Sequence, residues 1–379
     1  MSFQLTAEQE AIRQAVREFG EQEIRPVARE FDESREYPET IRKQAAKYDF
    51  VAPNIPEEYG GAGLDLLSTA VITEELWRAD AGIGSAISSA GFGTAMLIRY
   101  GDEWMKEGWL PKIAGGEAVS ASAISEPAHG SNVAGMETRA VRDDDEWVID
   151  GNKMWITNGN VADVAIVMAK TDPDAGHRGI TAFLVPTDTP GFTAHKIDNK
   201  LGIHASDLAE LTFDELRIPA ENVVGEVDKG FYQLMNFFAH GRVSVASQAL
   251  GVAQAAVDEA IAYANEREQF DQPISQFQAI RHKIADMATS VEAARSLNYR
   301  AATAVESGDD DIAAKFASMA KLFASEQSVR VADEGLQVHG GAGYVTDHPA
   351  ERFYRDARIT KIYEGTSEIQ KNIIADRLL

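Results

Sequence analysis

The chain has 379 residues, no cysteine and a formal net charge of −24 at pH 7. The length predicts more than one domain, and the lack of cysteine excludes disulfides, thiolate metal ligands and cysteine nucleophiles. The acidic balance argues against a nucleic-acid partner, because a phosphate backbone requires a concentrated basic face.

The chain begins Met1-Ser2-Phe3-Gln4-Leu5, which lacks the basic flank and apolar core of a secretion signal. No apolar run reaches the roughly 18 residues of a membrane span. We therefore expect a cytoplasmic protein with no membrane span. Two sources of the acidic excess stay open: a high-salt cytoplasm that screens the repulsion, or ordinary acidic solubility.

Residues 1–117 have the pattern of an all-helical domain. Thr6 and Gln9 form a capping box that predicts the start of the first helix. The apolar stripe that follows at helical spacing consists of Ile12, Val16, Phe19, Val27 and Phe31. Further helices are expected over about 68–77 and 86–100, before Gly115-Gly116 closes the segment.

Residues 118–228 change to short β-branched runs separated by turn clusters such as Asn158-Gly159-Asn160 and Pro190-Gly191. Several short strands at near-regular spacing favour a small sandwich or barrel over helix-linked parallel strands. The expected strands are Trp147–Ile149, Ala165–Met168, Ile180–Val185, Phe192–Ile197 and Leu211–Ile218.

Helix returns over residues 229–379. Ser275 and Gln278 repeat the capping-box pattern, and apolar residues three or four apart follow, as in a buried bundle seam. With a helix bearing Ile312 and a last helix bearing Ile373, this part predicts a four-helix bundle. The expected fold class is therefore α+β and mostly α, with three domains.

Several common catalytic motifs are missing from the sequence. Gly341-Ala342-Gly343 lacks the third glycine of a dinucleotide fingerprint and follows a helix instead of a strand. No Walker loop, Gly-x-Ser-x-Gly elbow or His-Glu-x-x-His motif occurs. The eight histidines show no ligand spacing, so we expect no metal site.

Two polar clusters lie where the helical and β segments meet. The first, Ser125–Asn132, concentrates hydroxyls and small residues where ligands commonly bind. In the second, Trp155 and Thr157 are two residues apart, which places them on the same side of a strand. A planar cofactor could stack on Trp155 while Thr157 binds its edge. The alternatives are a packed turn and a core tryptophan.

Glu364 stands directly before Gly365 and Thr366, where a chain bends and backbone donors are free. A solvated surface carboxylate is the ordinary role of such a residue. A catalytic base is the alternative, and the surrounding motifs decide between them.

At these positions the sequence resembles the flavin-dependent acyl-CoA dehydrogenases over nearly the whole chain. The motifs that carry the resemblance occur in one order: Ser122–Asn132, Trp155–Gly159, Gly241-Arg242, Ala246–Gly251, Arg267 with Phe270 and Gln278, Gln337–Tyr344, Arg355–Ala357 and Ile362–Thr366. Several long motifs in order are far more specific than any one of them.

The resemblance implies an N-terminal helical domain, a middle β domain and a C-terminal bundle. It also implies a homotetramer, a dimer of dimers, with FAD between domains and partly held by a neighbouring subunit. The implied reaction is the dehydrogenation of an acyl-CoA to the trans-2-enoyl-CoA. Glu364 would remove the α-proton while the β-hydride passes to flavin N5, and an electron-transferring flavoprotein would receive the electrons.

By the same resemblance, two sets of residues form the site. The implied FAD contacts are Ser122, Ser125, Gly130, Ser131, Trp155, Thr157, Arg267, Phe270, Gln278, Gln337, Gly340, Gly341, Thr366 and Glu368. The implied substrate contacts are Ser131, His240, Gly241, Arg242, Tyr363 and Gly365. His129, Asn132 and Asp271 depart from the family pattern and leave the expected fold and chemistry unchanged.

Three positions bear on the substrate. Isovaleryl and long-chain members place their base where this chain has Gly241, so that alternative base is absent. Glutaryl members use an arginine where this chain has Gly84, which argues against a dicarboxylic substrate. Trp77 either shortens the acyl pocket or packs in the core.

We expect a short-chain substrate such as butyryl-CoA, with a medium- or branched-chain dehydrogenase as the alternative. An acyl-CoA oxidase and a non-catalytic flavoprotein or acyl-CoA-binding subunit are two further hypotheses. Oxidases usually carry an additional C-terminal domain, and an intact Glu364 argues against a non-catalytic protein.

Overall fold

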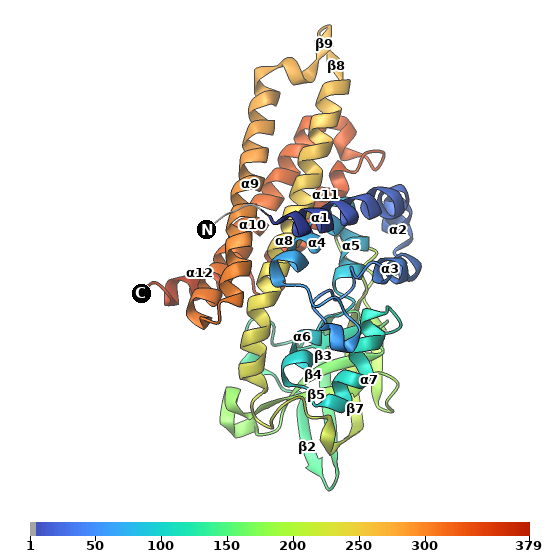
Figure 1. Ribbon diagram of the computed structural model, residues 1–379, viewed down its shortest axis with the longest axis vertical. Helices are drawn as coiled ribbons and strands as arrows, with labels where there is room; N and C mark the ends of the chain where they lie inside the picture. Colours follow the sequence, from blue (N-terminus) through green and yellow to red (C-terminus); the bar gives the residue numbers. More distant parts are fainter. Residues whose placement is uncertain (1–4) are drawn as a thin grey trace.

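The computed structural model describes residues 5–379, which form a helical N-terminal part, a central sheet and a C-terminal helical bundle (Figure 1). This order confirms the predicted fold class, whereas the boundaries after residues 117 and 228 stay predictions. The interpretation drawn from Met1-Ser2-Phe3-Gln4 lies outside the described residues. Within residues 5–379, no helix combines the length and apolarity needed to cross a membrane.

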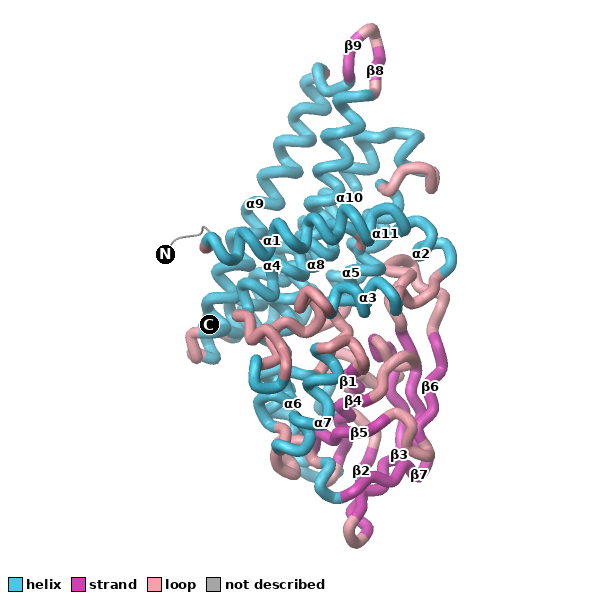
Figure 2. Tube along the Cα trace, turned by 45° about the vertical axis from the view of Figure 1, so that its right-hand side comes forward, coloured by secondary structure: helices cyan, strands magenta, loops and turns pink. Residues whose placement is uncertain are grey.

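The N-terminal helices pack beside the bundle and over the sheet (Figure 2). They are α1 (Ala7–Phe19), α2 (Ala28–Ser34), α3 (Glu39–Ala46), α4 (Leu66–Ala79), α5 (Ala81–Ser88), α6 (Thr94–Tyr100) and α7 (Glu103–Ala114). The Thr6 hydroxyl accepts a hydrogen bond from the Gln9 N–H at 3.2 Å, and the Gln9 side chain accepts one from the Thr6 N–H at 3.1 Å. The predicted capping box is therefore confirmed.

Two helix predictions in this part were wrong. The expected helix over 86–100 is divided between α5 and α6, because Gly93 has φ +103°, in the left-handed region that ends a helix. The stripe through Val27 and Phe31 does not belong to one helix either. A π-helical turn over Gly20–Ile24 and a 3₁₀ turn with Pro26 separate α1 from α2.

The central part is one seven-stranded mixed sheet in the order β1-β4-β2-β3-β7-β6, with β5 paired to β4. Its strands are β1 (Ser120–Ala123), β2 (Arg139–Asp143), β3 (Glu146–Thr157), β4 (Val164–Lys170), β5 (Ile180–Pro186), β6 (Phe192–Lys196) and β7 (Leu208–Pro219). Four of the five expected strands fall within β3, β4, β5 and β7, and the fifth, Phe192–Ile197, extends one residue beyond β6. The sequence did not predict β1 and β2, because serine, alanine and charged residues give them no β-branched run.

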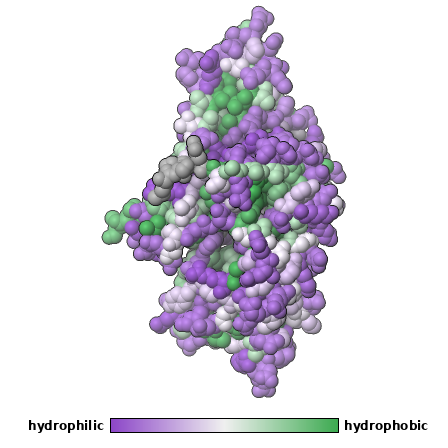
Figure 3. Space-filling model, in the orientation of Figure 1, coloured by the Kyte–Doolittle hydropathy of each residue, from purple (hydrophilic) through white to green (hydrophobic). Residues whose placement is uncertain are grey.

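Three long helices form the bundle, and two short ones pack against α10. They are α8 (Gly230–Glu266), α9 (Gln278–Glu306), α10 (Asp310–His339), α11 (Ala350–Ala357) and α12 (Ser367–Asp376). A small hairpin of β8 (Glu268–Gln269) and β9 (Gln272–Pro273) projects at one end between α8 and α9 (Figure 1). Figure 3 shows an apolar area on the upper bundle. Some apolar residues of the bundle, among them Ile280 and Ile284 of α9, are only partly buried.

The predicted capping box at Ser275 was wrong. Residues Ile274–Gln276 form a 3₁₀ turn, and Phe277 precedes α9 without a side-chain capping bond. The spacing of serine and glutamine matched the motif, but Pro273 and the preceding hairpin set a different path for the chain.

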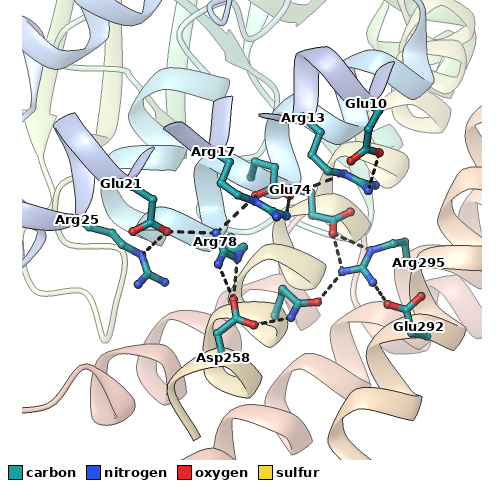
Figure 4. A network of polar contacts seen from close by, with 12 residues as sticks. Glu10, Arg13, Arg17, Glu21, Arg25, Glu74, Arg78, Asp258, Glu292 and Arg295 are labelled. Carbon is teal, nitrogen blue, oxygen red and sulfur yellow. Dashed lines mark hydrogen bonds and ion pairs between the residues drawn. The ribbon is translucent and has the colours of Figure 1, made fainter. Parts of the chain in front are cut away.

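A charged network joins the N-terminal helices to the bundle (Figure 4). Arg295 of α9 contacts the buried carboxylate of Glu74 on α4 at 2.8 Å. Arg78 of α4 contacts Asp258 of α8 at 2.7 Å. Burial raises the pKa of Glu74, and Arg295 acts in the opposite direction, so the ion pair offsets part of the cost of burying this carboxylate.

Candidate active site

Glu364 lies in the short turn between the segment after α11 and helix α12. Glu364 has φ +52° and Gly365 has φ +90°, so two successive residues occupy the left-handed region. The Thr366 hydroxyl caps α12, and the Gln370 side-chain amide donates to the carbonyl oxygens of Glu364 and Gly365 at 3.1 and 2.9 Å. The start of α12 therefore holds the turn in one shape.

The Glu364 side chain points at Gly241 of α8. A Cβ added at Gly241 would lie 2.7 Å from the Glu364 Oε2 atom, so glycine is what leaves room for the carboxylate. Oε2 is buried and has no hydrogen-bond partner within residues 5–379. The next residue on α8, Arg242, is also buried, and its Nε atom likewise has no partner there.

The charges around Glu364 oppose the effect of its burial. Burial raises the pKa of Glu364 to about 7, although Arg242 and Lys321 both favour its ionised form. Burial likewise lowers the pKa of Arg242, and the nearby Glu364 counteracts that effect. A carboxylate with a pKa near neutrality is a stronger base than a surface glutamate and is still ionised at working pH.

Lys321 of α10 is a residue that the sequence analysis missed. It is buried, and its Nζ atom donates to the carbonyl oxygen of Gly365 at 2.6 Å. Burial lowers the pKa of Lys321 to about 8, while Glu364 acts in the opposite direction. The available signal was a lone lysine in a run of small and apolar residues, Ala317–Ala324.

Tyr363 has a partner that the sequence analysis also missed. Its hydroxyl donates a hydrogen bond to the side-chain oxygen of Gln248, one of the buried residues of α8. Burial raises the pKa of Tyr363 well above its usual value, so the phenol stays protonated and remains a donor. This bond ties the residue before Glu364 to α8, two turns beyond Gly241.

Most of the residues expected to bind substrate lie around Glu364. His240, Gly241 and Arg242 are consecutive on α8, and the last two approach Glu364. Tyr363 and Gly365 flank Glu364 in the same turn. Ser131 is an exposed residue of the loop that follows β1, and its place in the substrate site stays a prediction.

A second cluster of expected contacts comes from the sheet. Ser122 of β1 is buried, and its hydroxyl has no partner within residues 5–379. The Ser125 carbonyl accepts a hydrogen bond from the Met154 N–H at 2.9 Å, which joins the segment after β1 to β3. Beneath them the buried Lys153 contacts Glu126 at 2.9 Å and the Ile124 carbonyl oxygen at 3.1 Å.

Trp155 stands out on β3 because its side chain is 60% exposed. This exposure excludes the core-tryptophan alternative. Trp155 has φ +66°, and the pairing of β3 with β7 shifts between Lys153 and Ile156. The bulge turns the Trp155 side chain outward, and the buried Ile156 separates it from the half-buried Thr157, as expected if Trp155 and Thr157 lie on the same side of the strand.

A third set of expected cofactor contacts lies at the far end of the bundle. These residues are exposed and comprise Arg267, Phe270, Gln278, Gln337, Gly340 and Gly341. Along α8, Gly241 and Arg267 are separated by about 39 Å of helix rise. One chain therefore does not bring this set together with Glu364.

The remaining positions take local roles. Thr366 caps α12, Glu368 is exposed in its first turn, and Gly130 is exposed beside Ser131. Asp271 has φ +61° in the β8–β9 hairpin, a conformation that glycine adopts with less strain.

Family models match almost the entire chain. The N-terminal domain model of acyl-CoA dehydrogenases matches residues 6–117, the middle-domain model matches 121–216, and the C-terminal domain model matches 228–379. A probable acyl-CoA dehydrogenase, FadE25 of Mycobacterium tuberculosis, is 44% identical over 100% of this chain and 97% of its own. The short-chain specific acyl-CoA dehydrogenase of Mus musculus mitochondria is 42% identical over 100% and 92%.

Solved structures show the same architecture. Butyryl-CoA dehydrogenase from Megasphaera elsdenii has a TM-score of 0.95 and 38% identity, with 100% of both chains covered. A chain from the structural work on the electron transferring flavoprotein of Acidaminococcus fermentans has a TM-score of 0.96 and 39% identity over 100% of both chains. A glutaryl-CoA dehydrogenase from Mycobacterium smegmatis in complex with FADH2 has a TM-score of 0.93 and 33% identity, covering 99% and 95%.

Proposed function

This chain belongs to the acyl-CoA dehydrogenase family, and from that premise we propose that it dehydrogenates a short-chain acyl-CoA to the trans-2-enoyl-CoA, with FAD as cofactor. The observation that carries the proposal is the buried carboxylate of Glu364. One of its oxygens lies beside Gly241 with no hydrogen-bond partner in the described part of the chain, and two buried cations, Arg242 and Lys321, lie near it.

In the proposed reaction Glu364 removes the α-proton of the thioester. Its ionised fraction at neutral pH makes it available, and its raised pKa makes it a better proton acceptor. FAD, when bound, accepts the β-hydride with its two electrons. The backbone N–H of Glu364 has no hydrogen-bond partner within residues 5–379, so it can donate to the thioester oxygen as negative charge develops there.

The residues present fit a flavin. The hydroxyl of buried Ser122, which has no partner among residues 5–379, offers a donor, and the exposed ring of Trp155 offers an aromatic face. We propose that Ser125 and Thr157 bind the flavin edge, with Gly130 and Ser131 nearby. Thr366 and Glu368 would lie along the phosphates and ribose.

The residues at the far end of the bundle would hold the cofactor of another subunit. This assignment is supported by the separation along α8 and by the exposure of Arg267, Phe270, Gln278, Gln337 and Gly340-Gly341. The apolar area on the upper bundle in Figure 3 fits the homotetramer that the resemblance implies. The cytoplasmic location likewise stays a prediction.

A short acyl chain is supported by two comparisons, the mouse short-chain enzyme and the butyryl-CoA dehydrogenase structure. Gly84 also agrees with a substrate that has no distal carboxylate, because a Cβ there would lie 2.7 Å from the Leu76 carbonyl oxygen. Trp77 is buried among α4, α5 and α8, and its indole N–H donates to Ser88 at 3.2 Å. It therefore has the packing role that the sequence left as one alternative.

Reduction of the bound flavin by acyl-CoA tests the proposal. The purified protein should be yellow, and anaerobic butyryl-CoA should bleach it faster than acyl-CoAs of longer or branched chains. In air, slow oxygen uptake and reduction of an added electron-transferring flavoprotein are the expected results. Rapid peroxide formation would identify an oxidase instead, and a yellow protein that no acyl-CoA bleaches would overturn dehydrogenation.

Replacing Lys321 with methionine should move the acidic limb of the pH–rate profile to higher pH. Flavin reduction requires ionised Glu364, so the rate rises as pH passes through about 7. Because the pKa of Lys321 is about 8, the lysine is still charged where Glu364 titrates and favours the carboxylate. Removing this cation raises the pKa of Glu364.

Stopped-flow bleaching between about pH 5.5 and 9 measures the Lys321→Met effect, with the exposed Lys371 of α12 changed to methionine as the control. The control profile should coincide with the wild type. A Lys321→Met profile with an unmoved limb and full flavin content would contradict the electrostatic role.

A further inference from the structure

Three side chains with metal-binding atoms meet at the end of the bundle that is remote from Glu364. Glu259 comes from α8, His339 ends α10, and His348 belongs to the segment before α11. Their donor atoms all lie within 4.8 Å of one another, a grouping found once among residues 5–379. Because 80 residues separate Glu259 from His339, the sequence spacing gave no sign of this cluster.

The Nε2 atom of His339 has a lone pair available for a metal ion. Its Nδ1 atom lies 2.7 Å from the Gly335 carbonyl oxygen, which can only accept, so Nδ1 carries the proton and Nε2 does not. The residue is 3% exposed, and Nε2 has no hydrogen-bond partner in the described part of the chain.

Tyr263 holds both imidazoles in place. Its ring stacks on His339 with centroids 4.3 Å apart and meets the edge of His348 at 5.5 Å. The two imidazole centroids are 5.7 Å apart. An oriented imidazole with its second nitrogen bonded to a backbone carbonyl is the arrangement seen around protein-bound zinc.

We propose that Glu259, His339 and His348 bind a divalent transition-metal ion of the zinc type. Two imidazoles and one carboxylate favour zinc over magnesium or calcium, which take oxygen ligands. A tetrahedral zinc places its ligand atoms about 3.3 Å apart, so the ion draws these side chains inward. Glu259 and His348 are partly exposed, which leaves a position for water.

The bound ion links α8, the end of α10 and the segment that leads into α11. His339 directly precedes Gly340, which has φ +60°, and Gly341, where an added Cβ would meet nothing within 4 Å. Gly340 and Gly341 therefore leave open space at the start of this turn. A metal on His339 and His348 therefore fixes both ends of the segment between them.

Zinc uptake by the purified full-length protein tests the site. After treatment with chelator and its removal, we expect equilibrium dialysis at micromolar ZnCl2 to load one ion per chain and to raise the thermal unfolding midpoint. MgCl2 at the same concentration should do neither. Absence of stoichiometric zinc at this concentration would overturn the proposal.

Substitutions of the proposed ligands test whether the ion binds to them. His348→Ala and Glu259→Gln should each weaken zinc binding about tenfold or more. His282→Ala, at an exposed position on α9, is the control and should bind as the wild type does. Flavin content verifies that each variant folds. If His348→Ala is unstable, Glu259→Gln still tests the site, because glutamine has nearly the shape of glutamate. Equal zinc binding by wild type, His348→Ala and Glu259→Gln would place the ion elsewhere.

Discussion

Replacing Glu364 with glutamine should leave the flavin bound and slow its reduction by butyryl-CoA about 10³- to 10⁴-fold. The amide has nearly the shape of the carboxylate, so it should fit beside Gly241 and keep the hydrogen bonds that Gln370 makes to the turn. What it loses is the negatively charged, basic oxygen that accepts the α-proton. Anaerobic stopped-flow bleaching measures the rate directly.

The control for this experiment is Asp376→Asn, which neutralises an exposed carboxylate at the end of α12. It should bleach at the wild-type rate. The flavin spectrum of Glu364→Gln should still change when butyryl-CoA binds. This measurement distinguishes a variant that has lost the chemical step from one that has lost substrate binding. Reduction of Glu364→Gln within a few-fold of the wild-type rate would remove Glu364 from the mechanism.

Moving the carboxylate to α8 should restore part of the activity. A Cβ at Gly241 would lie 2.7 Å from the present position of the Glu364 Oε2 atom, so a glutamate at 241 reaches the same space once the original side chain is gone. We therefore expect Glu364→Gly to be nearly inactive. Adding Gly241→Glu should accelerate bleaching about 10- to 100-fold over that single variant.

Glycine suits position 364 in this pair because the backbone there has φ +52°. The matched control is Gly241→Gln combined with Glu364→Gly, which has the same bulk at 241 but no carboxylate. It should remain as slow as Glu364→Gly. Equal rates for the glutamate and glutamine versions would show that the space beside Gly241 is not where the proton is removed.

Local patterns predicted much of the fold. The Thr6 capping box and the strands β3 to β7 are encoded by neighbours within a few residues, and the structure confirms them. The errors at 86–100 and at Ser275 have one cause. A pattern of side chains marks a helix, but a glycine in the left-handed region or a preceding hairpin decides where the helix begins and ends.

The sequence predicted the site residues that belong to a recognisable motif. It did not predict the residues that reach the site only through the packing of helices. Glu364 belongs to the motif Ile362–Thr366. Its side chain approaches Gly241, the position at which the resemblance placed the alternative base of other family members. Lys321, Gln248 and the metal-type cluster could not be found in this way. Each depends on two or more helices meeting side by side, a contact that no local spacing records.

The projecting β8–β9 hairpin carries Phe270 with 86% of its surface exposed. If a second subunit and its cofactor cover this ring, as proposed above, then assembly and cofactor retention are one linked equilibrium governed by mass action. Protein concentration would then set occupancy as strongly as cofactor concentration does. Under that linkage, specific activity per chain falls on dilution even though no residue beside Glu364 has changed.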